Sequence, residues 1–136
     1  MKFSIIAALL VFFISGCTTT KVPAPSDTSE NSLNFEKNEE DEYDIIVFDP
    51  QYDVYLNTTA KPKNFYSENY YKNKNRFYVN EWNLRHSQPF SYDPDLYAVH
   101  IDYQPNVDYG LTLEYKLYNF FKFIEWKYKV NLGFGR

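Results

Sequence analysis

The sequence predicts an α+β fold, a small α-rich domain with two long helices, one or two short helices and a minimal two-stranded sheet. Two observations carry this prediction. Aromatic and aliphatic side chains recur at helical spacing over residues 66–86 and 111–130. Short β-branched or alternating runs at 44–48 and 97–103 are typical of strands. The chain has 136 residues, which suffices for one such domain with additional segments.

The predicted domain begins with a buried strand over residues 43–48, an apolar run between an acidic stretch and a proline. Asp49 and Pro50 then form the pair expected at a helix start, because aspartate caps free N–H groups and proline suits the first turn. A short helix from Pro50 to about Asn57 should follow.

The first long helix is expected over residues 66–86, with Ser67 as its N-cap and Pro89 just beyond its end. Its aromatic stripe contains charged residues, among them Glu81 and Arg85, which are four positions apart and can pair. Either this charged row stays in solvent while the stripe edges pack on different elements, or the two residues form a semi-buried pair facing a cleft.

Asp93 and Pro94 repeat the capping signal, and residues 97–103 alternate weakly between apolar and polar side chains. We expect a strand there, which could pair with residues 44–48.

The last long helix is expected over residues 111–130, although its first part also alternates as a strand would. One face is continuously apolar and forms a core face. A second stripe contains Tyr115, Phe123 and Trp126, the candidate binding surface, since aromatic side chains are enriched at recognition surfaces. The alternative is that both faces are buried because this helix is central.

The N-terminal residues predict a lipoprotein signal peptide over residues 1–16. The apolar run of residues 3–14 spans about 18 Å as a helix, too short to cross a bilayer. The motif Ile14-Ser15-Gly16-Cys17 that follows resembles the lipobox of bacterial lipoproteins. This resemblance implies cleavage between Gly16 and Cys17, a diacylglycerol on the Cys17 sulfur and an acyl chain on its amino group.

The residues after Cys17 bear on location. Thr18 stands where an aspartate would retain many lipoproteins in the inner membrane, and no acid lies in the next few positions. We therefore expect a lipid anchor in the outer membrane, on its periplasmic face. The acidic run at 39–42 leaves the cell surface as the alternative.

Residues 17–42 are predicted to be an acidic, flexible tether, and residues 43–136 the globular domain. The tether has a net charge of −5 from two lysines and seven acids, whereas the domain has equal numbers of both charges. The absence of a basic excess argues against a nucleic-acid partner.

The sequence contains no motif that selects a catalytic or metal site. His86 and His100 are far apart in sequence and lack metal-ligand spacing, so we expect no metal and no cofactor beyond the lipid on Cys17. Glu68, Glu81, Glu114 and Glu125 are available as acids, but nothing in the sequence selects a pair.

Several short motifs, most of which contain an aromatic residue, occur in the same order as in a known family. They are Asp49-Pro50, Tyr66-Ser67, Tyr70-Tyr71, Glu81-Trp82-Asn83, Ile101-Asp102-Tyr103, Pro105-Asn106, Asp108-Tyr109-Gly110-Leu111 and Tyr115-Lys116-Leu117-Tyr118. Over residues 43–125 the chain resembles a small envelope lipoprotein family of Bacteroidetes-type bacteria with a domain of unknown function. The resemblance implies an envelope lipoprotein and supplies no catalytic residues.

Two functions are consistent with these residues. The first is a non-catalytic, membrane-tethered interaction or structural module that binds an envelope protein or a glycan. The second is a small envelope enzyme, such as a cell-wall hydrolase, with Glu81 as acid/base and Arg85 orienting it.

Overall fold

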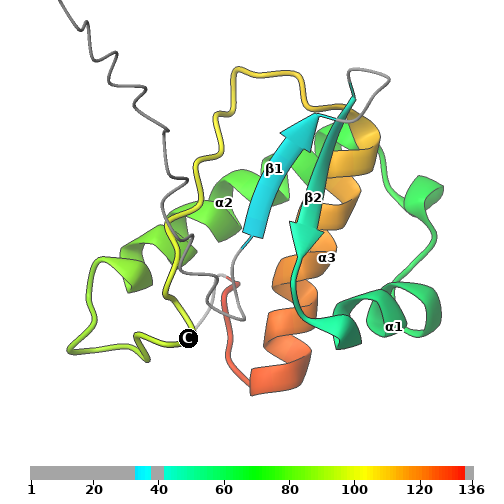
Figure 1. The fold of residues 1–136 in the computed structure, drawn as a ribbon. Coiled ribbons are helices and arrows are strands. Elements are labelled where there is room, and N and C mark those ends of the chain that lie inside the picture. Colours follow the sequence, from blue (N-terminus) through cyan, green and yellow to red (C-terminus); the bar gives the residue numbers. More distant parts are fainter. Residues whose placement is uncertain (1–32, 38–41, 134–136) are drawn as a thin grey trace, which may run out of the picture.

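The computed structural model of the chain describes residues 33–37 and 42–133 (Figure 1). The elements in chain order are β1 (Leu33–Lys37), β2 (Tyr43–Val47), α1 (Pro50–Thr58), the 3-10 turn η1 (Lys63–Phe65), α2 (Glu68–His86) and α3 (Gly110–Tyr128). The expected signal peptide, Gly16, Cys17 and the expected tether up to residue 32 lie outside the described residues. The predicted α+β class, with two long helices and a two-stranded sheet, is confirmed.

The helix starts follow the capping residues of the sequence. The side chain of Asp49 accepts a hydrogen bond from the Gln51 backbone N–H at 3.0 Å, and Pro50 is the first residue of α1. Ser67 accepts one from the Tyr70 N–H at 3.2 Å at the start of α2. These side chains satisfy N–H groups that have no partner within the helix.

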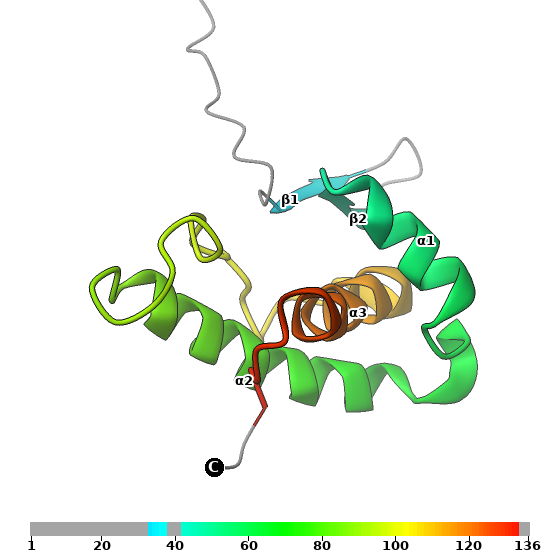
Figure 2. The same cartoon turned by 90° about the horizontal axis from the view of Figure 1, so that it is seen from below.

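Helix α3 occupies the centre of the domain. Figure 2 shows it between the sheet and α2, with α1 along a third side, and side-chain packing joins it to all three. The apolar residues that α3 buries are Leu113, Leu117, Phe120, Phe121, Phe123 and Ile124. The core face of α3 is therefore interior, and Phe123 of the second stripe is buried as well, whereas Trp126 of that stripe stays half exposed.

The sheet corrects the expected boundary of the domain. β1 lies within residues 17–42, the segment expected to be a tether, and pairs antiparallel with β2 so that Leu33 lies opposite Val47. Leu33 is buried, and Phe35 packs on Tyr109 with ring centroids 5.9 Å apart. Two apolar side chains on one face of a strand are a weak signal within a polar segment, but here they extend the core.

The strand expected at residues 97–103 is not observed, and its expected pairing with residues 44–48 is wrong. Side chains of α2 bind the backbone of this segment instead. Trp82 Nε1 donates to the Val99 carbonyl at 2.7 Å, while Asn83 both donates to the Ile101 carbonyl and accepts from its N–H, each at 2.9 Å. Because these contacts satisfy backbone groups that a strand would pair, the segment docks on α2 without joining the sheet.

Aromatic side chains fill the interface between α2 and α3. Tyr78 stacks on Phe121 with centroids 5.2 Å apart, and Trp82 lies 5.4 Å from Phe120. Tyr71 and Trp82 are almost completely buried. No helix of the described part of the chain is long and apolar enough to cross a membrane.

Candidate functional site

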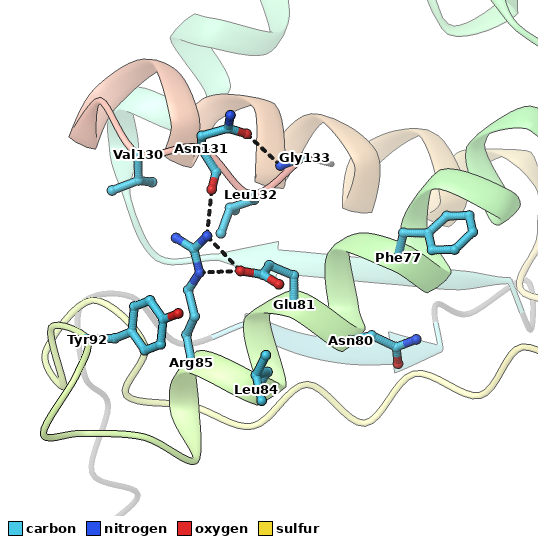
Figure 3. Close-up of a pocket in the computed structure, with 10 residues that line it drawn as sticks. All are labelled: Phe77, Asn80, Glu81, Leu84, Arg85, Tyr92, Val130, Asn131, Leu132 and Gly133. Atoms are coloured by element: carbon cyan, nitrogen blue, oxygen red, sulfur yellow. Dashed lines mark hydrogen bonds and ion pairs between the residues drawn. The ribbon is translucent and has the colours of Figure 1, made fainter. Parts of the chain in front are cut away.

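A groove of about 880 Å³ runs along α2 and is closed on its other side by the segment after α3 (Figure 3). The residues that line it are Phe77, Asn80, Glu81, Leu84, Arg85, Tyr92, Val130, Asn131, Leu132 and Gly133. Residues of three separate parts of the chain thus meet here: α2, the loop after it, and the C-terminal segment. The groove combines apolar walls with one ion pair.

Arg85 lies at the junction of these three parts. Its Nε donates to Glu81 Oε1 at 2.8 Å, Nη1 donates to the Tyr97 hydroxyl at 2.8 Å, and Nη2 donates to the Asn131 carbonyl at 2.6 Å. The guanidinium also lies 5.1 Å from the centre of the Tyr92 ring, within range of a cation–π interaction. Partial burial alone would lower the pKa of Arg85, but its hydrogen bonds to Tyr97 and Glu81 outweigh burial and raise it. Arg85 therefore fastens two segments to α2.

Glu81 is the more exposed member of the ion pair. Its side chain is 32% exposed, against 13% for Arg85, and a single oxygen, Oε1, receives both Nε and Nη2 of Arg85. Among the described residues that line the groove, Glu81 is the single carboxylate. The structure thus places the pair at the edge of a groove, with Glu81 at the rim and Arg85 beneath it.

The three aromatic residues of the candidate binding surface do not form one exposed face. Phe123 has no exposed surface, because Tyr52 and Tyr55 of α1 pack on it at centroid distances of 5.6 Å each. Trp126 is 49% exposed, and the partly buried Tyr115 donates its hydroxyl to the Lys61 carbonyl at 3.0 Å. The surface expected from the sequence is therefore corrected: α1 covers its centre.

A buried polar cluster lies between α2 and α3. Glu114 of α3 has no exposed surface and accepts hydrogen bonds from Asn75 Nδ2 at 2.7 Å and from the Tyr103 hydroxyl at 3.0 Å. Burial raises the pKa of Glu114, although the hydrogen bonds from Asn75 and Tyr103 act in the opposite direction. Burial and the neighbouring Glu114 also raise the pKa of Tyr103.

The sequence did not single this cluster out. Glu114 was one of four available acids, and its partners are 39 and 11 residues away. The available signal was the position of Glu114 next to Leu113 on the core face of α3, where an unpaired carboxylate would be costly. Because the side chain of Glu114 has no exposed surface and its oxygens bind Asn75 and Tyr103, its position indicates a structural role.

The two histidines are far apart in sequence, but the fold brings their rings near one another. The rings of His86 and His100 have centroids 5.9 Å apart. In the described part of the chain, no cluster of three or more histidine, cysteine, aspartate or glutamate residues has the geometry to hold a metal ion.

Comparison with known protein families gives a match over nearly the whole chain. The model of a family described as "Family of unknown function (DUF6146)" matches residues 4–134. No curated protein and no solved structure matches the chain.

Proposed function

The chain belongs to a family of unknown function, DUF6146, and from this premise we propose that it is a bacterial cell-envelope lipoprotein whose folded domain is a non-catalytic interaction module. The lipid on Cys17 anchors it, and the groove beside α2 is its docking surface. The anchor is placed in the outer membrane, with the domain on the periplasmic face and the cell surface as the alternative.

The N-terminal sequence supports the anchor. The charged start, the short apolar run and the small residues before Cys17 occur in the order that lipoprotein processing requires. The family match covers residues 4–134, a range that includes the apolar run and Cys17. Two or three acyl chains hold a protein stably at a membrane, whereas one chain does so marginally.

The observation that supports the non-catalytic role is that the guanidinium of Arg85 donates its hydrogen bonds to other groups of the protein. Its contacts to Glu81, Tyr97 and Asn131 tie three segments together. An arginine that binds a substrate needs donors directed at the groove, and here the donors bind side chains and backbone of the protein itself. A glycosidase would also need a second carboxylate across the groove from Glu81, and none is found among the described lining residues.

The lining of the groove indicates the kind of partner. Leu84 is about half exposed, and it lines the groove together with the half-buried Tyr92 and Val130. Exposed apolar surface next to a carboxylate fits a protein segment that presents an apolar side chain with a lysine or arginine nearby. A glycan fits less well, because Arg85 covers one face of the Tyr92 ring on which a sugar would stack.

Mass spectrometry of the mature N-terminus tests the anchor. We expect a chain that begins at Cys17 and carries the mass of the lipid, and we expect Cys17→Ser to release the protein from the membrane fraction. A free Met1, or an unmodified Cys17 in membrane-bound protein, would refute the anchor.

Photo-cross-linking in cells tests the docking surface separately. A photoreactive amino acid at position 84 should give a discrete cross-linked product with an envelope protein, and Glu81→Lys should abolish it. The matched control is the same group at Val54, an exposed apolar position on α1. Equal products at both positions, or a product insensitive to Glu81→Lys, would contradict the groove as the docking surface.

A small cell-wall hydrolase that uses Glu81 as acid/base is the second candidate function, favoured by the exposure of Glu81 at the groove rim. Glu81→Gln would then abolish cell-wall cleavage by the purified protein while the fold is retained. Equal cleavage by both proteins, or no cleavage by either, would exclude this role.

A further inference from the structure

His86 and His100 belong to neither the groove nor the buried cluster, and they come together from different parts of the chain. His86 is the last residue of α2, and His100 lies in the segment that docks on α2. Their ring centroids are 5.9 Å apart and the ring planes are inclined by 69°. The sequence contains only these two histidines.

The orientation of His86 is fixed by a hydrogen bond. Its Nδ1 lies 2.7 Å from the Tyr97 carbonyl oxygen, which can only accept, so Nδ1 carries the proton. In the neutral ring Nε2 then keeps a free lone pair. Metal-binding histidines share this arrangement, in which the second ring nitrogen donates to a backbone carbonyl and fixes the ring.

The backbone that carries His100 is also fixed. Trp82 binds the carbonyl of Val99, and Asn83 binds both the N–H and the carbonyl of Ile101. These contacts hold the residues on either side of His100 against the last turns of α2. Its side chain is exposed, so the ring can rotate towards His86.

The distance between the rings suits a shared ion. With metal–N bonds of about 2.1 Å, two imidazoles on one ion have centroids about 5.2 Å apart in tetrahedral geometry and about 6.4 Å apart on opposite sides of the ion. The observed 5.9 Å lies between these values, and rotation of the exposed His100 ring can shorten it to the tetrahedral distance.

We propose that His86 and His100 form a binding site for a divalent transition-metal ion of the kind that prefers imidazole ligands: Cu²⁺, Ni²⁺ or Zn²⁺. The two rings occupy two coordination positions, and water or a ligand from outside the chain fills the others. Affinity follows the general order of these metals, with Cu²⁺ bound most tightly. The site is independent of the lipid anchor and of the groove.

NMR titration of the full chain tests the site, with Cys17 alkylated so that its thiol cannot bind the metal. Because there are two histidines, their ring Cε1–H signals give two unambiguous probes. Zn²⁺ should shift both signals with one midpoint and a stoichiometry of one ion per chain, and a chelator should reverse the shifts. Responses at clearly different Zn²⁺ concentrations would mean two separate surface imidazoles and would overturn the proposal.

Matched substitutions provide the second arm. His86→Asn retains a donor towards the Tyr97 carbonyl but removes Nε2, and His100→Asn changes an exposed side chain. Each should weaken Zn²⁺ binding, measured by calorimetry, by about a hundredfold, because a bidentate site becomes monodentate. Unchanged affinity in either folded variant would refute the site. If His86→Asn fails to fold, His100→Asn alone decides.

Discussion

Glu81 and Glu114 are two glutamates on packed helices, and the structure uses them in opposite ways. Glu114 lies inside the seam between α2 and α3, with a raised pKa and partners on α2 and on the loop before α3. Glu81 lies at the rim of a groove, partly in solvent, with one oxygen held by Arg85. The difference between the two regions lies in how the surrounding groups hold each charge.

This difference separates a carboxylate that supports the fold, Glu114, from one that a partner in solution can reach, Glu81. Losing Glu114 leaves buried donors without an acceptor, whereas losing Glu81 leaves Arg85 with two other acceptors and solvent. Substitutions in the seam should therefore change stability strongly, and those at the rim should mainly change recognition.

The largest effect is expected for Glu114→Ala. One N–H of Asn75 Nδ2 and the Tyr103 hydroxyl lose their acceptor in a buried site, while Asn75 keeps its other hydrogen bond to the Glu114 carbonyl, so the free energy of unfolding should fall by about 4 kcal/mol. Urea denaturation of the purified full-length chain measures this loss. Glu114→Gln is the control, because it keeps one acceptor oxygen and should cost less than half as much. Equal losses in both variants would show that shape, and not hydrogen bonding, matters at this position.

Arg85→Ala should lower stability by about 2 kcal/mol, since it removes charged hydrogen bonds to Tyr97 and to the Asn131 carbonyl. The same denaturation experiment measures the effect. Arg76, an exposed arginine on the same helix, is the matched control and should change stability by no more than about 0.5 kcal/mol on replacement with alanine. Similar values for the two arginines would contradict the fastening role of Arg85.

The raised pKa of Glu114 predicts a dependence of stability on pH with a defined sign. The folded state holds the proton more tightly than the unfolded state, whose pKa is near 4.5. The stabilisation is thus fully present below that value and is lost as the pH rises through the folded pKa, by at most about 1.4 kcal/mol per pH unit. Unfolding free energies of the wild type minus those of Glu114→Gln, measured from pH 4.5 to 8, should decrease with pH. An increase would mean that the fold favours the ionised carboxylate.

The smallest effect is expected for Glu81→Gln, which removes a partly exposed ion pair and should cost about 0.5 kcal/mol. High salt should reduce the difference from the wild type further, because it screens the pair. A loss as large as that of Arg85→Ala would show that Glu81 is as structural as Glu114, and the contrast between the two regions would fail.

The helices were predictable because their signals are local. Asp49, Pro50 and Ser67 mark helix starts, and the periodic side chains of α2 and α3 continue for about five turns. The ion pair of Glu81 and Arg85 followed from their spacing of four residues. Such features depend on residues that are close together in the sequence, so a single sequence is enough to predict them.

The features that were missed depend on distant partners. β1 forms because β2 pairs with its backbone and Tyr109 packs on Phe35 of its apolar face. Residues 97–103 alternate as a strand does, yet Trp82 and Asn83 take up their backbone groups. The clusters of Glu114 and of the two histidines likewise join residues that no local pattern relates.

The position of β1 changes how far the domain can stand from a membrane. If Cys17 carries the lipid, residues 18–32 link it to the first strand, and 15 residues reach no farther than about 50 Å even when fully extended. Residues 17–32 contain one lysine and two acids, and β1 has one of each charge, so most of the acidic excess lies between the two strands. Residues 18–32 would then be a short and nearly neutral link between the lipid and the domain. The acidic residues between β1 and β2 would be repelled by an anionic membrane surface, so the domain would orient with them away from the membrane.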